Sequence, residues 1–156
     1  MKTLLHVSRK AAAAAALSAV GALLLPSTTT AQAAAVPSYE ITFHINFSQP
    51  GDPGGHPEPY GYVRLDFEGG THHTLWEQSE DNASTRETYG PETYTYTGDL
   101  KNIKSISADV DEDDAWPNGD DSIGYGTEPW RGQGDYTFTE DDGSTTVVIE
   151  RVKPLN

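Results

Sequence analysis

The residues most able to do chemistry in this chain form one acidic loop, which runs from Asp109 to Gly124. Six aspartates and one glutamate occur between Asp109 and Asp121, and Trp116 lies among them. Carboxylates this close together repel one another unless a positive group joins them. Carboxylate oxygens are also the ligands that Ca²⁺ prefers in proteins. The loop therefore indicates either a calcium site or a solvated acidic turn that binds nothing specific.

The first residues have the pattern of a secretory signal peptide, which we place at residues 1–35. Three basic residues lie among the first ten, and an Ala- and Leu-rich stretch follows over residues 11–25. The small residues after it predict cleavage after Ala33 or Ala35. The alanine-rich style is typical of bacterial signals. A retained membrane anchor is the alternative, but the stretch is short for a span. We therefore expect a secreted protein of residues 36–156 with no transmembrane segment.

Composition limits the partners and the means of stabilisation of the secreted part. All 24 acidic residues follow the predicted signal and three of the ten Lys and Arg residues lie inside it, so residues 36–156 carry a formal charge of −17. Such a surface disfavours nucleic acid and other anionic polymers as partners. The chain has no cysteine, so no disulfide can staple it. A single domain of this length can instead bury a hydrophobic core.

Alternation of apolar and polar residues recurs along the chain, whereas helical periodicity is hard to find. Every second residue from Tyr39 to Phe47 is apolar, which is typical of a half-buried strand. In the last such run both faces carry Val or Ile, so the pattern leaves open which face is buried. Clusters of Gly, Pro, Asn and Asp separate the runs. The sequence predicts an all-β fold, a single antiparallel eight-stranded β-sandwich. The expected strands are residues 39–47, 60–67, 72–77, 92–97, 102–112, 122–126, 135–139 and 145–152.

The order of the strands predicts where the charge lies. In an antiparallel sandwich, the loops from odd to even strands gather at one end and the loops from even to odd strands at the other. The odd-to-even loops contain most of the loop carboxylates, including the acidic loop. We therefore expect one strongly negative end and one nearly neutral end.

Two of these loops share a further arrangement. Asp52 is followed six residues later by Glu58, then by Pro-Tyr and a strand, and the strand over residues 102–112 ends in alternating acids. This arrangement resembles the first and third calcium loops of the C-two phospholipid-binding sandwich domains of protein kinase C and synaptotagmin. Glu stands at 58 and 112 where the family has Asp, the third loop is slightly longer, and the basic strand patch of some members has no counterpart. The resemblance implies bound Ca²⁺, held by Asp52, Glu58, Glu112, Asp114 and the later Asp120 or Asp121.

Catalysis has little support in the sequence. Paired carboxylates also serve glycoside hydrolases, but this domain is small, and carboxylates crowded in a turn are more often solvated or metal-bound. Neither a nucleophile elbow nor a phosphate loop is present. His72 and His73 are adjacent on a strand and face opposite sides, so they cannot share a zinc ion. We expect a protein that is not an enzyme.

The aromatic residues separate into core and surface candidates. Trp76 lies within a strand and is expected in the core. Trp116 lies at the tip of the acidic loop, where there is no core to fill, and is therefore the candidate ligand contact. Tyr94 and Tyr96, with Trp130, either form a platform for sugars or pack on a sheet as ordinary strand aromatics.

Two function classes follow from these residues. In the first, the protein is a calcium-binding recognition module whose acidic end and Trp116 contact a lipid headgroup or a polysaccharide. In the second, it is a secreted inhibitor or toxin-associated subunit that binds a basic protein through the acidic end, with calcium incidental.

Overall fold

The structure is a computed structural model, and it describes residues 34–50, 56–113 and 121–156. The predicted signal, except for its last two residues, lies outside this part of the chain. So do Asp52, Asp114, Asp120 and Trp116, on which part of the predicted calcium and ligand site depends. No helix within the described residues has the length and apolar character needed to cross a membrane.

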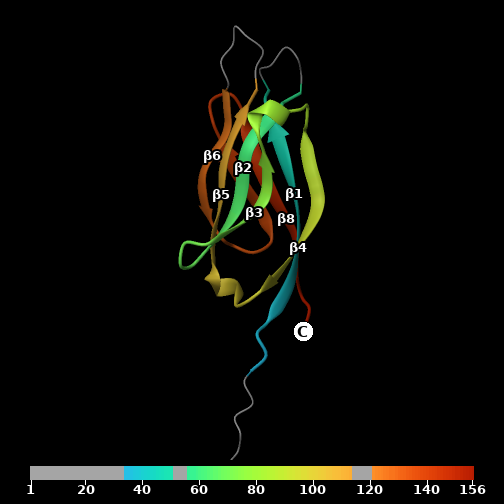
Figure 1. Cartoon of the computed structure of the whole chain (residues 1–156), viewed down its shortest axis with the longest axis vertical. Coiled ribbons are helices and arrows are strands. Elements are labelled where there is room, and N and C mark those ends of the chain that lie inside the picture. Colours follow the sequence, from blue (N-terminus) through green and yellow to red (C-terminus); the bar gives the residue numbers. More distant parts are fainter. Residues whose placement is uncertain (1–33, 51–55, 114–120) are drawn as a thin grey trace, which may run out of the picture. The chain divides into compact units, whose positions relative to one another are not determined.

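Over the residues that the structure describes, the protein is an all-β sandwich of eight strands in two antiparallel sheets, as predicted. The first sheet has the order β4-β1-β8-β7 and the second the order β3-β2-β5-β6 (Figure 1). Two single turns of 3₁₀ helix, η1 (Glu80–Asn82) and η2 (Leu100–Asn102), precede β4 and β5. The strands are β1 (Ser38–Ser48), β2 (Pro59–Phe67), β3 (His72–Gln78), β4 (Thr88–Thr97), β5 (Ile103–Glu112), β6 (Asp121–Pro129), β7 (Gly134–Thr139) and β8 (Ser144–Pro154).

The core lies between the sheets and is built from the alternating side chains of the strands. In β1 the inward positions run from Ile41 to Phe47, and Phe47 packs against the buried Trp76 with ring centroids 4.9 Å apart. Trp76 is thus a core residue, as predicted. In β8 the buried side chains are those of Val147 and Ile149. The sequence alone left open which face of this strand is buried. Burial of this apolar surface is the main term that stabilises a chain without disulfides.

One strand begins earlier than the sequence indicates. The prediction started this strand at residue 92, directly after Pro91. In the structure β4 begins at Thr88 and passes through Pro91, and its pairing with β1 shifts between Phe43 and Ile45. β4 is the edge strand of its sheet, so a residue there can lack an N–H without loss of a ladder bond.

Candidate functional site

The four loops that connect odd to even strands reach the same end of the sandwich, which we call the acidic end. The ends of β1 and β5 and the segment η1 lie together at the top of Figure 1. Arg86 is the one Lys or Arg among the described residues of these loops. This confirms the charge separation for the described part of the chain. The described carboxylates of the acidic end are Glu58, Glu80, Asp81, Glu87, Glu112, Asp113, Asp121, Glu140, Asp141 and Asp142.

Backbone hydrogen bonds tie three of these loops to one another. Asp113 N donates to Glu58 O at 3.1 Å, which joins the β5–β6 loop to the β1–β2 loop. Arg86 N donates to Pro57 O at 2.7 Å, which adds the β3–β4 loop. The Glu58 carboxylate also accepts a hydrogen bond from the Thr85 hydroxyl at 3.1 Å. The described carboxylates of these three loops therefore stand on segments that backbone hydrogen bonds join to one another.

Glu112 differs from the other acids because it faces the interior. It continues the inward alternation of β5 and is only 2% exposed. Its carboxylate accepts a hydrogen bond from Gln49 Nε2 at 3.2 Å, and Asp121 stands opposite it in the ladder with β6. A buried carboxylate needs such partners, because burial without them disfavours the charged form.

The described part of the predicted calcium site contains Glu58, Glu112 and Asp121. They do not form a group of three metal-ligating side chains, and no other such group occurs among the described residues. The side chains of Glu58 and Glu112 are directed instead at neutral donors, Thr85 and Gln49. Because Asp52, Asp114 and Asp120 lie outside the described residues, the calcium site stays a prediction.

An ion pair at the acidic end was not singled out from the sequence. His56 Nδ1 lies 2.7 Å from the carboxylate of Glu87, and both side chains are more than half exposed. The two residues are 31 positions apart and come from different loops. No local pattern could have identified the pair.

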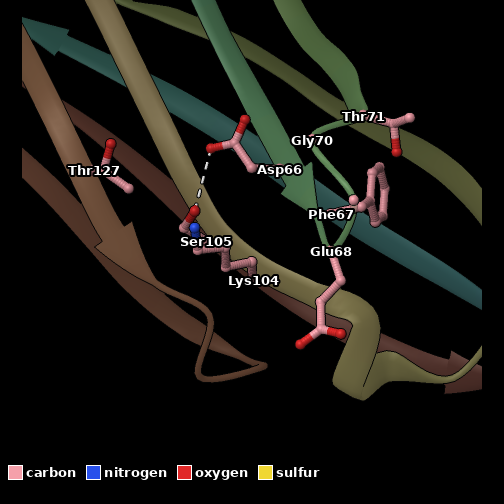
Figure 2. Close-up of a pocket in the computed structure, with 9 residues that line it drawn as sticks. Asp66, Phe67, Glu68, Gly70, Thr71, Lys104, Ser105 and Thr127 are labelled. Carbon is pink, nitrogen blue, oxygen red and sulfur yellow. Dashed lines mark hydrogen bonds between the residues drawn. The ribbon is translucent and has the colours of Figure 1, made fainter.

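Among the described residues, the opposite end of the sandwich carries balanced charge and an open pocket beside the β2–β3 loop. Its loops contain Glu68 and Asp99 but also Lys101 and Arg131. Figure 2 shows the pocket, about 550 Å³ in volume, between the β2–β3 loop and the start of β5. Asp66 at its edge accepts a hydrogen bond from the Ser105 hydroxyl at 3.2 Å.

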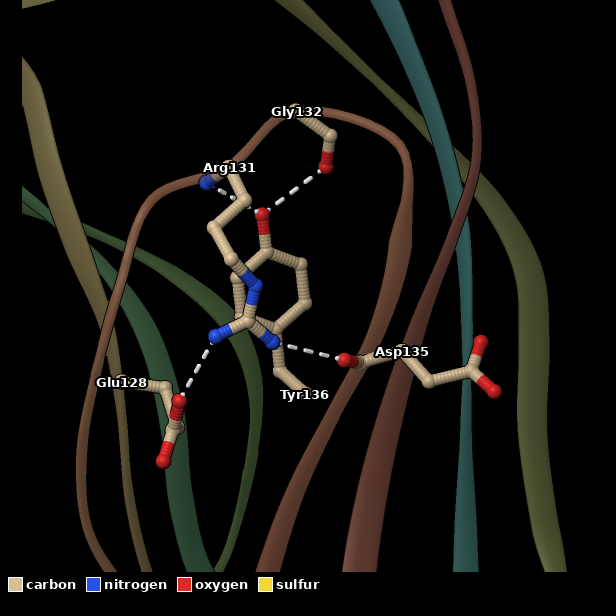
Figure 3. Close-up of polar contacts among 5 residues, drawn as sticks. All are labelled: Glu128, Arg131, Gly132, Asp135 and Tyr136. Atoms are coloured by element: carbon tan, nitrogen blue, oxygen red, sulfur yellow. Dashed lines mark hydrogen bonds and ion pairs between the residues drawn. The ribbon is translucent and has the colours of Figure 1, made fainter.

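The β6–β7 loop at this end is held by a buried tyrosine. The hydroxyl of Tyr136 accepts a hydrogen bond from Arg131 N at 2.7 Å and donates one to Gly132 O at 2.8 Å (Figure 3). The Arg131 guanidinium bonds to the Glu128 carboxylate at 2.8 Å and to Asp135 O at 2.9 Å. Burial raises the pKa of Tyr136. The indole of Trp130 stacks on Tyr136, with centroids 6.0 Å apart, so Trp130 helps to close the sandwich.

The tyrosines of β4 and the histidines of β3 also pack locally. Tyr96 is buried, and its hydroxyl donates to Asp99 O at 3.1 Å. Tyr94 stacks on His73 with centroids 3.6 Å apart, and burial lowers the pKa of His73. These contacts favour the packing interpretation over the sugar platform. His44, on the first sheet, pairs with Glu150 at 2.7 Å, so it shares no site with the histidines of β3.

Comparison with known proteins gives a fold likeness. No protein-family model and no curated protein matches the sequence. A chain in the crystal structure of the Cry23Aa1 and Cry37Aa1 binary protein complex superposes with a TM-score of 0.60 and 24% sequence identity, covering 76% of this chain and 98% of that chain. At this identity the likeness establishes the sandwich fold. It does not test the C-two resemblance, which stays a prediction.

Proposed function

We propose that this protein is a secreted, toxin-associated type of subunit that binds a basic protein through its acidic end. The observation that carries the proposal is the acidic end itself, where the described residues include nine carboxylates besides the buried Glu112 and a single arginine. The structural neighbour supports a protein partner, because it belongs to a binary protein complex. Of the two function classes, these observations favour the protein-binding subunit over the lipid- or polysaccharide-binding module.

The charge distribution suits this role physically. Exposed carboxylates gathered at one end raise the local concentration of a cationic partner and accelerate its association. The backbone bonds that join Glu58, Asp113, Arg86 and Pro57 hold the loops in place. Less conformational entropy is then lost on binding, which improves affinity without added contacts.

The proposal can be tested with a nona-lysine peptide as the basic probe. A double variant, Asp113→Asn with Asp121→Asn, removes two charges from the acidic end. Two partly exposed charges contribute roughly 1–2 kcal/mol to such binding, so the affinity should fall about five- to thirty-fold. The matched control, Glu92→Gln with Asp135→Asn, removes the same net charge from the first sheet, where both residues are exposed.

Titration calorimetry at low and physiological salt provides the measurement. We expect weaker binding by the acidic-end variant and nearly unchanged binding by the control. Salt should weaken the wild-type complex most, because screening acts on exposed charges. Equal losses in both variants would show that only the net charge matters, and would contradict a site at the acidic end.

A further inference from the structure

Tyrosine and aspartate side chains alternate across the outer face of the second sheet. Tyr62 of β2 stands opposite Asp109 of β5, and Asp109 stands opposite Tyr125 of β6. On the other side, Tyr62 stands opposite Glu77 of the edge strand β3. One row across all four strands therefore reads acid, tyrosine, acid, tyrosine. We call the surface formed by Tyr60, Tyr62, Asp109, Asp111 and Tyr125 the tyrosine face.

The tyrosine face is most open to solvent at Tyr125, on the edge strand β6. Tyr125 is 66% exposed. Tyrosine is enriched at the energetically important positions of protein interfaces. The row thus has the composition of a contact surface, although the sheet needs none of these rings for its core.

A guanidinium already stacks on this face within the protein itself. The Cζ atom of Arg64 lies 3.5 Å from the ring centroid of Tyr62, and the buried Arg64 Nε has no hydrogen-bond partner. Burial and then the charge of Asp109 raise the pKa of Tyr62, so this ring stays neutral. The packing of Arg64 shows that a guanidinium can lie over a tyrosine ring on this face.

The tyrosine face continues into the acidic end. Tyr60 pairs with Asp111 one step nearer that end, and Pro59 then pairs with Glu112. The carboxylates on the outer face outnumber its one arginine described above, Arg64, so the face is net negative. Its charge is therefore complementary to that of a cationic partner. A second copy of this chain would carry the same excess of acids and be repelled.

We propose that the partner places an arginine-rich segment along the tyrosine face, with guanidinium groups stacked on Tyr125 and paired with Asp109. This inference rests on the proposed function and specifies the partner's chemistry. Arginine is favoured over lysine because its planar group stacks on a ring and meets a carboxylate through two parallel hydrogen bonds. The acidic end attracts the partner by charge alone, and the tyrosine face selects arginine.

The experiment compares nona-arginine with nona-lysine as probes of the protein. Wild-type protein should bind nona-arginine several-fold more tightly than nona-lysine, because a guanidinium stacks on a ring and meets a carboxylate through two hydrogen bonds. Tyr125→Phe keeps the ring and should keep this ratio. Tyr125→Leu keeps apolar bulk without the ring and should lower the ratio clearly, leaving only the preference that pairing with Asp109 provides. Circular dichroism checks that both variants remain folded, as expected for an exposed side chain.

Different results overturn different parts of the reasoning. Equal affinities for the two peptides in wild-type protein, or an unchanged ratio in Tyr125→Leu, would overturn the tyrosine face and leave the proposed function standing. If a neutral oligosaccharide displaces nona-arginine, the tyrosine face binds glycans, and the proposal of an arginine-rich partner segment is overturned as well. If neither peptide binds, the proposed function falls and the inference with it. The acidic-end variant Asp113→Asn with Asp121→Asn should weaken both peptides while preserving their ratio, which supports two separable contributions.

Discussion

Replacement of Tyr136 by Phe tests how the neutral end is held together. The ring is fully buried, and its hydroxyl is bonded both to Arg131 N and to Gly132 O within 2.8 Å. The change removes one oxygen atom and leaves the ring in place. Packing against Trp130 is therefore preserved, and the variant isolates the two hydrogen bonds.

The magnitude follows from these two bonds. Each contributes about 1 kcal/mol net, and the groups left behind in a part-buried loop lose a partner. We expect the free energy of unfolding to fall by about 2 kcal/mol. A domain of about 120 residues has an unfolding entropy near 0.25 kcal/mol/K, so the midpoint should fall by roughly 8 °C.

Urea unfolding and scanning calorimetry would measure this loss, with Tyr125→Phe as the matched control. Its hydroxyl lies on an exposed ring, so the control should change stability by less than about 0.5 kcal/mol. If Tyr136→Phe unfolds within that same margin of wild type, the hydrogen bonds seen at the β6–β7 loop do not stabilise the fold. The variant should also bind basic peptides normally, because the loop lies at the end opposite the acidic end.

Alkaline pH gives a second readout of the same residue. Burial raises the pKa of Tyr136 in the folded state. The stability tied to its neutral form is therefore fully present below the unfolded pKa, near 10, and is lost as the pH rises through the folded value. Tyr136→Phe should lose stability less steeply than wild type above about pH 10. Parallel curves for the two proteins would contradict the assignment.

Three further changes test other parts of the structure. Gly61 has φ of +112°, and a Cβ there would collide with the backbone of β5, so Gly61→Ala should destabilise by about 2 kcal/mol or more in urea unfolding; Gly69→Ala, at φ +87° in open space, should cost clearly less. Burial lowers the pKa of His73, so the stability of its neutral form is present above about pH 6.5 and lost as the pH falls through the folded pKa. The free energy of unfolding of His73→Gln should therefore fall less than that of wild type between pH 7.5 and 5. Identical pH profiles of stability for the two proteins would refute this. If the acidic loop holds calcium, Ca²⁺ at 100 times its dissociation constant should stabilise by about 2.7 kcal/mol, far more than Mg²⁺ does. The double change Asp114→Asn with Asp121→Asn should abolish that increment, and an undiminished effect in calorimetry would reject the site.

Much of the fold was predictable because the period of two is a local property of the sequence. The alternation from Tyr39 to Phe47 identified β1 and its inward face without further information. In β8, where Val147 and Val148 are both apolar, the decision came from tertiary contacts. Thr145 is buried and donates a hydrogen bond from its hydroxyl to Ile123 O at 3.0 Å, which fixes the odd positions inward. Which face of β8 is buried is therefore decided by its contact with β6, which the sequence of β8 alone does not show.

The same distinction applies to the candidate sites. The acidic end was predictable because it requires only the number of strands, whose parity decides the end at which each loop emerges. The tyrosine face was not predictable, because it depends on the register of β2, β5 and β6. A slip of one residue would move Tyr62 and Tyr125 to the inner face. The bulge between Val110 and Asp111 shifts that register in a way that no local pattern of β5 records.

The acidic end and the core have opposite effects on stability, and this opposition bears on function. Like charges gathered at one end raise the free energy of the folded state, most of all when no partner is bound. The strands bury enough apolar surface to hold the fold in spite of this repulsion, and the backbone hydrogen bond from Asp113 N to Glu58 O joins two of the loops. A cationic partner would remove the repulsion and gain the attraction, so binding and folding stability are linked by mass action. Under the proposed function, this linkage accounts for a charge pattern that is unfavourable for the isolated sandwich.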